Sequence, residues 1–428
     1  MLYQFLVYHQ PSKTMLFDIS GDSLTLPSFT RKEFHAAETT PIHTFFYDEY
    51  GLNTNVLQRI KTEDSRIVYE VEVLDREPLH HHAETSWTSP FSKNALLQLE
   101  KSEAEVLKKW KAELKKKTFP WSEYGFRSEI ESWVKTVLND PDAFFQQIRS
   151  WEKGVLLKVT SSQQNAYVKV APPVFKHEPL VQKYMDRYGP EVLAIDPSKH
   201  AYVMREMRGE LLGDSLAVEF WEEAARRLAQ LQSAFCEDEG RQRPSIPDRS
   251  LDEVISAPML ISTVQAVQNW LAPKEVIKLL ASVPAVVSLL SLLKTKQLQS
   301  IDHGDFFGGN VIIENDEPFL YDWSNSCLTH PFLSLVHFLE EVEAEFLKSN
   351  SEDVLHEYLQ HWTHVERFEV LRDDFAIMKL LHPIFYLVVH VQFIMPELGQ
   401  TAEDEDIIDH YLTEWSSNVY EIDQRLKG

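Results

Sequence analysis

Cysteine, long apolar runs and positive charge are all scarce in this sequence of 428 residues. Only Cys236 and Cys327 occur, which excludes a small secreted scaffold held together by disulfides. The first residues contain no basic segment followed by an apolar one, so no signal peptide is evident. The longest apolar stretch, residues 380–395, is shorter than the ~20 apolar residues of a membrane-spanning helix. These absences predict a cytoplasmic protein in which residues 380–395 form a buried helix.

The charge balance limits the possible partners. Acidic side chains outnumber basic ones, 66 to 42, and the formal charge is −24 at pH 7. A field of this sign repels nucleic-acid backbones and anionic lipid, so neither nucleic acid nor a membrane is an expected partner. The same field attracts a cationic small molecule. The sequence indicates no particular oligomeric state.

The length predicts more than one domain, since domains usually hold roughly 100–200 residues. Hydrophobic residues make up 43% and charged residues 25%, as in a soluble globular protein with a sizeable core. Strand-like and helical patterns divide the chain into a small α+β domain (1–90), a connecting helix and joint (91–127), a β-rich lobe (128–207) and a helical lobe (208–428).

The segment between the first two domains reads as a helix and an ordered joint. Residues 92–117 contain few helix breakers and have Leu and Val at helical spacing, which predicts one helix. Its lysines are more typical of a solvated connecting helix than of a nucleic-acid patch. The joint at 118–126 is rich in aromatic residues, which are costly to expose, so we expect them to pack between the domains. The alternative is a fused first domain with an independent role.

The remainder of the chain has the layout of a bilobal kinase. Strands are predicted at 154–160, 166–171 and 200–207, with a helix at 175–188 between the last two. From about residue 216 helices dominate, apart from a hairpin at 310–323. The expected fold class is therefore α+β: a protein-kinase-like phosphotransferase with a small β-rich lobe and a large helical lobe, preceded by a small α+β domain.

Three polar residues accompany the hairpin. Asp305 and Asn310 are five positions apart, and Asp322 follows Asn310 by twelve. Phosphoryl transfer needs a carboxylate that orients and deprotonates the attacking group, and oxygen ligands that hold Mg²⁺ on the nucleotide phosphates. A loop followed by a hairpin supplies all three from one support. Polar turns in a helical protein are the alternative, which the combination of an HGD triplet, the asparagine and a hairpin ending in Asp-Trp disfavours.

These motifs resemble those of the aminoglycoside phosphotransferase and choline kinase family, whose fold is related to that of protein kinases. HGDFFGGN is similar to that family's catalytic loop, and YDW to its metal-binding aspartate. The resemblance implies that Asp305 is the catalytic base, that Asn310 and Asp322 bind Mg²⁺, and that ATP or another nucleoside triphosphate is the phosphoryl donor. His303, two residues before Asp305, fits an ordering role in the loop better than proton transfer.

The β-rich lobe contains the other expected parts of a nucleotide site. A kinase needs a strand lysine that reaches the nucleotide phosphates and a helix glutamate that holds this lysine. Lys169 lies in the predicted strand AYVKVA, and Glu178 follows nine residues later at the start of a predicted helix. By resemblance, the backbone around Glu206 and Met207 would contact the adenine, as a hinge between the lobes.

The turn expected to cover the phosphates departs from the protein-kinase pattern. Protein kinases use a G-x-G-x-x-G loop, whereas the corresponding segment here, WEKGVLL, has Gly154 as its only glycine. The small-molecule kinase family commonly has a shorter, glycine-poor turn, so the departure favours that family over protein kinases.

The first domain resembles a degenerate Nudix domain. Aligning Gly51 and Leu52 with the end of a Nudix box places Asp48 and Glu49 at its final acidic pair, but the earlier glutamates and the arginine are missing. Two acids on one helix turn bind a divalent cation poorly, so diphosphate hydrolysis is not expected. An unrelated α+β domain with an acidic helix end is the alternative. The consecutive histidines 80–82 are expected in a solvated loop.

The leading hypothesis is an ATP-dependent kinase that phosphorylates a hydroxyl group of an amine- or sugar-containing small molecule. Alternatives are a pseudokinase-like nucleotide-binding scaffold and a bifunctional Nudix hydrolase–kinase. A cationic acceptor is expected from the net charge and from acidic clusters near the predicted site, although such clusters are more often solvated helix faces. The residues of these clusters are Glu340, Glu341, Glu343, Glu345 and 403–406.

Overall fold

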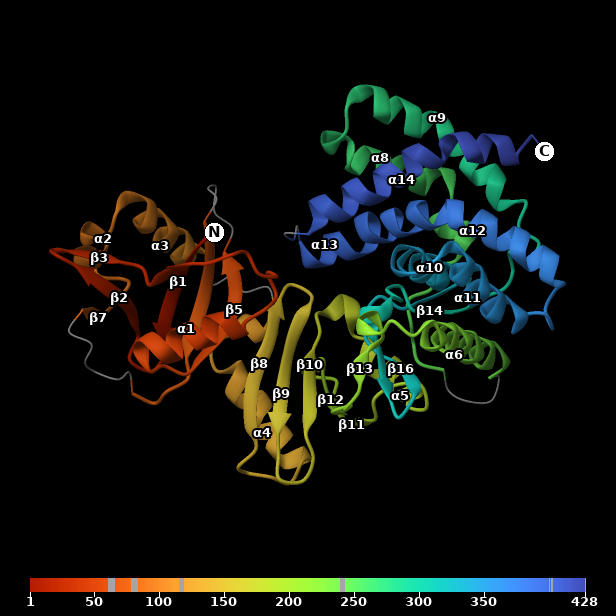
Figure 1. The fold of residues 1–428 in the computed structure, drawn as a ribbon. Helices are drawn as coiled ribbons and strands as arrows, with labels where there is room; N and C mark the ends of the chain where they lie inside the picture. Colours follow the sequence, from red (N-terminus) through yellow and green to blue (C-terminus); the bar gives the residue numbers. More distant parts are fainter. Residues whose placement is uncertain are drawn as a thin grey trace. The chain divides into compact units, whose positions relative to one another are not determined.

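The structure of the protein is a computed structural model that describes residues 1–60, 66–77, 84–114, 119–238, 243–399, 401 and 403–427. The histidines 80–82 and the end of the predicted helix 92–117 lie outside these residues. The chain forms two compact units (Figure 1). Unit 1 comprises Met1–Pro172 and Leu193–Arg205, and unit 2 comprises Pro173–Val192 and Glu206–Gly428.

The first sheet of unit 1 has seven strands in the described residues, in the order β3-β2-β1-β6-β5, with β4 paired to β1 and β7 paired to β2. Strands β1 and β6 are parallel, and the other pairs are antiparallel. The strands are β1 (Leu2–His9), β2 (Thr14–Ser20), β3 (Ser23–Thr25), β4 (Ser28–Thr30), β5 (Thr54–Ile60), β6 (Ile67–Val73) and β7 (Thr85–Thr88).

Strand β1 is buried on both faces of this sheet. Its odd-numbered residues, such as Phe5, belong to the core beneath α1 (Thr40–Tyr50), and its even-numbered residues, such as Leu6, belong to the core that contains Trp110 of α3. A strand covered on both faces is apolar almost throughout, which explains the run YQFLVY at the start of the chain. Helix α1 ends at Tyr50 and is followed by Gly51, whose φ of 66° suits glycine.

The single helix predicted over 92–117 is interrupted in the structure. It forms α2 (Lys93–Gln98) and α3 (Lys101–Glu113), separated by Leu99 and Glu100 in extended conformation. The break turns Leu99 into the sheet core, where it is 8% exposed. Burial of an apolar side chain therefore overrides helix propensity at this point, and α3 buries one face on the sheet while its lysines face outward.

The second sheet of unit 1 is antiparallel, with the order β11-β12-β10-β9-β8. Its core includes residues of α4 (Phe126–Val137). Strands β9, β10 and β12 confirm the predictions, whereas β8 and β11 were not predicted. The strands are β8 (Phe144–Trp151), β9 (Gly154–Thr160), β10 (Ala166–Val170), β11 (Val192–Asp196) and β12 (Ala201–Arg205).

The aromatic joint packs against both sheets of unit 1. It contains a short 3₁₀ turn, η1 (Pro120–Ser122). Trp121 is 3% exposed in the core of the second sheet and stacks on Phe119, while Tyr124 packs against the core of the first sheet. The joint is therefore an ordered part of unit 1, as its composition predicted.

Unit 2 is mainly helical, with small sheets in the orders β13-β15-β16 and β14-β17. The predicted helix 175–188 is shorter than expected: η2 (Pro173–Phe175) precedes α5 (Glu178–Tyr184). The strands are β13 (Glu210–Leu211), β14 (Ser300–Asp302), β15 (Val311–Glu314), β16 (Glu317–Leu320) and β17 (Cys327–Thr329). The remaining helices are η3 (Leu212–Asp214), α6 (Val218–Glu237), α7 (Leu251–Val254), α8 (Ala257–Ala266), η4 (Gln268–Trp270), α9 (Pro273–Leu290), η5 (Gly308–Asn310), α10 (Leu333–Glu345), α11 (Lys348–Gln360), α12 (Phe368–Val389), the π-helical turn η6 (His390–Ile394), α13 (Met395–Leu398) and α14 (Asp404–Arg425).

The apolar stretch at 380–395 lies within the continuous helical segment Phe368–Leu398. By length and composition this segment is sufficient to cross a membrane, but 78% of its most apolar window is buried inside the structure. The prediction of a buried helix is therefore confirmed.

Candidate active site

The HGD loop begins directly after β14 and leads through η5 into the β15–β16 hairpin. His303 fastens this loop at two points. Its backbone N–H donates to Ser334 Oγ (2.9 Å), and its Nε2 donates to the carbonyl oxygen of Tyr321 (3.0 Å). Its ring also lies 4.4 Å from the Trp323 ring, centroid to centroid. The histidine thus joins the start of the loop to the end of the hairpin, which is the ordering role inferred from the sequence.

The two ends of this segment bring the predicted catalytic residues of unit 2 together. Asn310 Nδ2 donates to the Asp305 carbonyl oxygen (2.8 Å) and to Asp305 Oδ2 (3.2 Å). The Tyr321 N–H donates to the Asn310 carbonyl oxygen (3.1 Å), and Asp322 is the next residue in the chain. Asp322 accepts a hydrogen bond from Ser324 Oγ at Oδ1 (2.8 Å). Asp305 and Asp322 are both half-buried.

The donor set of this segment suits Mg²⁺. The hydrogen bonds of the Asn310 amide nitrogen orient its Oδ1 as an acceptor, which leaves this amide oxygen and the Asp322 carboxylate as hard oxygen ligands. Among the described residues no group of three or more His, Cys, Asp or Glu residues could hold a metal ion. Mg²⁺ bound with nucleotide phosphates needs only one or two protein carboxylates, so this small set is adequate.

Backbone conformation shapes both ends of the segment. Gly304 has a φ of 77°, and a Cβ there would lie 2.7 Å from the Asn325 carbonyl carbon, so only glycine fits. Asp322 has a φ of 64°, which is unusual for a residue other than glycine. The hairpin turn residues Asn315 and Asp316 also have positive φ, as the favoured two-residue hairpin turn requires. Asp322 directly follows this hairpin, which supports its strained backbone. Backbone strain of this kind is found at functional sites.

Asp302 is a buried acid beneath the loop that sequence reasoning missed. It accepts hydrogen bonds from Ser334 Oγ (2.5 Å) and from the Tyr386 hydroxyl (2.8 Å), which tie β14 to α10 and α12. Its complete burial raises its pKa to about 6, although these hydrogen bonds oppose the rise. An acid directly before the HGD motif was the available signal for it.

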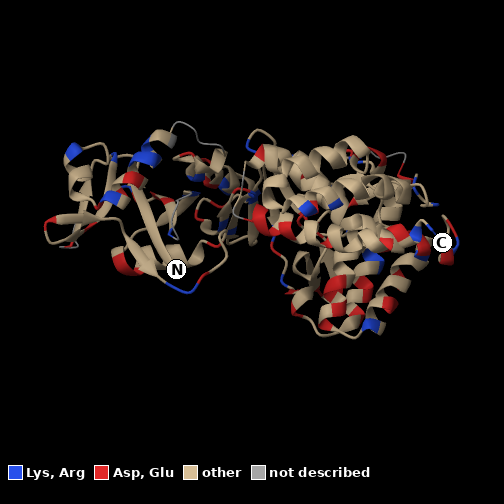
Figure 2. Cartoon of the chain, turned by 90° about the horizontal axis from the view of Figure 1, so that it is seen from above, with Lys and Arg blue, Asp and Glu red and all other residues tan. Residues whose placement is uncertain are grey.

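Further acidic groups surround Asp305 in unit 2, whose helices carry many of the Asp and Glu residues in Figure 2. Glu340, 3.8 Å from His337 Nδ1, raises the pKa of His337, and the Asp305 charge adds to the rise. Burial and the charges of Asp305 and Glu414 raise the pKa of Tyr411. These effects place residues of α10 and α14 near Asp305. Of the two glutamates named here, Glu340 belongs to the predicted acidic clusters and Glu414 does not.

Other members of the predicted clusters have local roles. Glu341 Oε2 accepts from the Gly308 N–H (2.6 Å), so this carboxylate supports the catalytic loop. Glu343 Oε1 accepts from Ser351 Oγ (3.0 Å), and Glu345 is exposed. Asp404, the first residue of α14, accepts from the Thr401 N–H (2.6 Å) and contacts His390 Nε2 (2.9 Å). The clusters therefore do not act as one acidic surface.

The predicted nucleotide residues of unit 1 lie on the second sheet. Lys169 is on the half-exposed face of β10, between the buried residues Val168 and Val170, as predicted. Gly154 starts β9 with a φ of 142°, and a Cβ there would lie 2.5 Å from the Val170 carbonyl oxygen. The glycine therefore permits close contact between two strands, a packing reason that is separate from any contact with phosphate.

The remaining predicted residues belong to unit 2. Glu178 is fully buried in the first turn of α5. Burial lowers the pKa of the preceding His177 to about 4, and the backbone of Ser324 and Ser326 opposes this change, so α5 lies near the segment that follows Asp322. Glu206 and Met207 are half-buried and follow β12 without regular structure. Because Lys169 and Glu178 lie in different units, their pairing remains a prediction.

Comparisons with known proteins found one matching family and several similar structures. Residues 170–368 match the model of the phosphotransferase enzyme family. A choline kinase from Cryptosporidium parvum Iowa II is similar in structure, with a TM-score of 0.50, 14% identity, and coverage of 69% of this chain and 97% of that chain. A choline/ethanolamine kinase family protein from Mesorhizobium loti has a TM-score of 0.48, 14% identity, and coverage of 69% and 98%.

An aminoglycoside phosphotransferase from Streptomyces rimosus in complex with ADP and streptomycin has a TM-score of 0.40, 15% identity, and coverage of 61% and 98%. No curated protein matches the chain. The likeness to choline kinase confirms the predicted kinase-like α+β fold. The match of residues 170–368 to the phosphotransferase enzyme family identifies an enzyme, a phosphotransferase with an alcohol group as acceptor, whose cofactors are ATP and Mg²⁺.

Proposed function

We propose that the protein is a kinase that transfers the γ-phosphate of ATP to a hydroxyl group of an amine- or sugar-containing small molecule. The observation that carries this proposal is the hydrogen bonding of Asn310 to Asp305, which holds a carboxylate and an amide oxygen together beside the hairpin that ends at Asp322. In this proposal the chain consists of a first domain (1–90), a connecting helix and joint (91–127), a small lobe (128–207) and a helical lobe (208–428). The protein is cytoplasmic.

Each predicted residue has a role in this proposal. Asp305 accepts the proton of the acceptor hydroxyl, and bound Mg²⁺ would neutralise charge on the transferring phosphate. Asn310 and Asp322 hold the metal. The nucleotide-binding residues are Lys169, Glu178, Glu206, Met207 and Gly154.

Positive charge on the acceptor would be recognised by acids near Asp305. Glu340 lies near His337, and burial together with the Glu340 charge raises the pKa of Glu414. Acids from α10 and α14 thus act on one region of unit 2, and a cationic acceptor would relieve their mutual repulsion. Catalytic efficiency with such an acceptor should fall as salt is added, because salt screens the attraction. An anionic best acceptor, or indifference to salt, would contradict the charge assignment.

A screen of ATP consumption against amines, sugars and aminoglycosides tests the activity. The expected result is acceptor-dependent ADP formation and a phosphorylated product, detected by mass spectrometry. Asp322→Ala should weaken binding of Mg·ATP, and the exposed Asp316→Ala on the same hairpin serves as its control. A chain that binds Mg·ATP but phosphorylates no member of a broad panel would favour the pseudokinase-like alternative. Release of phosphate from a nucleoside diphosphate-linked compound would favour the bifunctional one.

A further inference from the structure

A segment of the first domain covers the outer edge of the small-lobe sheet. Residues 35–39, here called the edge segment, run antiparallel to β8, with a bridge between Glu38 and Arg149. The Ser150 N–H donates to the Ala37 carbonyl oxygen (2.9 Å), and the Thr39 N–H donates to the Ile148 carbonyl oxygen (3.2 Å). Strand β8 is the last strand of its sheet, so the edge segment supplies the backbone partners that an edge strand otherwise lacks.

Gln147 fastens the same strand to the first sheet. Its Oε1 accepts from the Val56 N–H (2.8 Å), and its Nε2 donates to the Val56 carbonyl oxygen (3.0 Å). The register of β8 against β9 shifts next to Gln147, and the register of β5 against β6 shifts next to Val56. Two bulges thus meet, and the Gln147 amide pairs with the backbone of the edge strand β5 as a neighbouring strand would.

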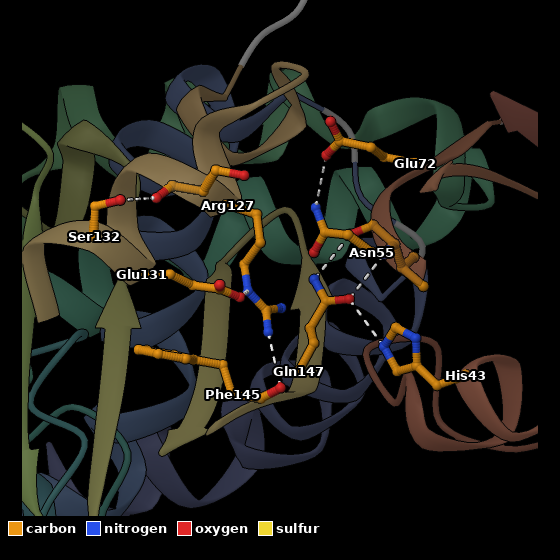
Figure 3. Close-up of polar contacts among 10 residues, drawn as sticks. His43, Asn55, Glu72, Arg127, Glu131, Ser132, Phe145 and Gln147 are labelled. Atoms are coloured by element: carbon orange, nitrogen blue, oxygen red, sulfur yellow. Dashed lines mark hydrogen bonds and ion pairs between the residues drawn. The ribbon is translucent and has the colours of Figure 1, made fainter. Parts of the chain in front are cut away.

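Further bonds surround this pair. Gln147 Oε1 also accepts from His43 Nε2 (3.1 Å), as Figure 3 shows. Thr39 Oγ1 donates to the Gln147 carbonyl oxygen (2.9 Å). On the other side, Arg127 Nη2 donates to the Phe145 carbonyl oxygen (3.1 Å) near the start of β8. Strand β8 is therefore held along its length by groups outside its own sheet.

The edge segment also reaches the turn at the end of β8. The His35 ring contacts the Trp151 ring edge-on, with centroids 5.4 Å apart. Trp151 pairs with Gly154 across the two-residue turn, and Lys153 Nζ lies 4.9 Å from the Trp151 ring centroid. The first domain thus contacts the turn that the proposed function places over the nucleotide phosphates.

We propose that the edge segment is a positioning element for the 151–154 turn and thereby increases the affinity for nucleotide. The inference rests on the proposed function, which assigns this turn to the phosphates. A loop that must become ordered when it binds a ligand loses affinity through the entropy of ordering, whereas a turn held beforehand does not. Support from the first domain therefore takes the place of a glycine-rich loop that closes on the phosphates.

The test uses the full-length chain and isothermal titration with Mg·ADP, which requires no knowledge of the acceptor. His35 is exposed, so His35→Ala removes the ring contact, together with the hydrogen bond that His35 Nδ1 accepts from the Ala37 N–H (3.2 Å), without opening the core. We expect its dissociation constant for Mg·ADP to rise roughly 2- to 12-fold, the equivalent of an aromatic pair. His35→Phe keeps a ring on Trp151 and should stay within about twofold of the parent. Glu33→Ala, an exposed change two residues away, is the matched control.

Two results would overturn the inference: parental affinity in His35→Ala, or equal weakening in Glu33→Ala. Lys169→Ala separates this failure from failure of the proposed function. If the parent does not bind Mg·ADP, or if Lys169→Ala binds as the parent does, the nucleotide assignment itself is wrong. Hydrogen exchange then tests whether the edge segment supports β8, independently of nucleotide binding. In His35→Ala the Ser150 amide should exchange faster, whereas the exchange of the Val168 amide should not change. An unchanged exchange rate at Ser150 would show that the edge segment does not support β8 either.

Discussion

Buried acids on β6 of the first sheet and the acids of the HGD loop in unit 2 serve opposite purposes. Glu70 and Glu72 are 0% and 5% exposed. Glu70 accepts from Trp110 Nε1 (2.9 Å), Gln58 Nε2 (2.7 Å) and the Tyr124 hydroxyl. Glu72 accepts from the backbone N–H of Gly125 (2.8 Å). Donors from α3 and from the joint thus occupy these carboxylates.

Asp305 and Asp322 in the HGD loop and hairpin are instead half-buried. The comparison shows that burial with several fixed donors makes an acid a structural connector, whereas partial exposure on a rigid support keeps its oxygens accessible to ligands. Asp48 and Glu49, the acids of the predicted Nudix-like segment, are exposed on the last turn of α1. The Nudix-like assignment itself stays a prediction.

The largest effect is expected from Asp305→Asn. Loss of the general base should lower turnover by roughly 10²–10⁴-fold and leave the dissociation constant of Mg·ADP nearly unchanged. Turnover with the acceptor found by screening and titration calorimetry measure the two quantities. Asp316→Asn makes the same chemical change at the exposed hairpin turn and should behave as the parent. If Asp305→Asn turned over at the parental rate, the proposed difference in role between the acids of the HGD loop and the buried acids of β6 would be contradicted.

Glu70→Ala tests the structural set. Removing this carboxylate leaves the buried Trp110 Nε1 and the half-buried Gln58 Nε2 without their acceptor, so the free energy of unfolding should fall by about 2–5 kcal/mol. Urea unfolding followed by tryptophan fluorescence measures this change. Glu77→Ala, an exposed change beyond the end of β6, is the control and should stay within about 0.5 kcal/mol of the parent. A loss for Glu70→Ala no larger than for the control would show that the bonds to Glu70 contribute nothing.

His43→Gln extends the comparison to a basic side chain of unit 1, which contacts Gln147 of β8. Desolvation of the His43 ring, with the Arg127 charge nearby, lowers its pKa to about 4. The unfolded chain therefore binds a proton more readily, and stability present above pH 6.5 is lost as the pH falls toward 4. Between pH 6.5 and 5 the parent should lose about 1–2 kcal/mol more than His43→Gln. The exposed His364→Gln should not change the pH profile from urea titrations. Parallel profiles for the parent and His43→Gln would contradict the shift.

Asp302→Asn should show the opposite pH dependence and a smaller effect. Burial raises the pKa of Asp302 to about 6, so the folded chain binds the proton more tightly, and this stability is lost as the pH rises through 6. Because asparagine does not titrate, the variant should gain about 1 kcal/mol relative to the parent between pH 5 and pH 7. Urea unfolding at both pH values measures the difference. A difference that does not depend on pH would show that Asp302 keeps one protonation state over this range.

Local sequence patterns were sufficient for the parts whose structure depends on neighbours along the chain. Lys169 alternates with buried valines on β10, and Asn310 is five residues from Asp305, so strand periodicity and a short loop determine their placement. The break at Leu99 was not predictable from propensity, because it depends on a core formed by distant strands. Asp302 was missed for a similar reason, since its partner Tyr386 lies far along the chain.

The sequence by itself determined the kinase-like order of elements, the HGD loop with its hairpin, and the absence of a disulfide framework, because each depends on composition or on residues close together in the chain. Only the tertiary structure decided that the first and second sheets belong to one compact unit. That outcome depends on Gln147 meeting the Val56 backbone at two facing bulges. An amide side chain that pairs with a strand 91 residues earlier leaves no periodic signal, because only folding brings the two together.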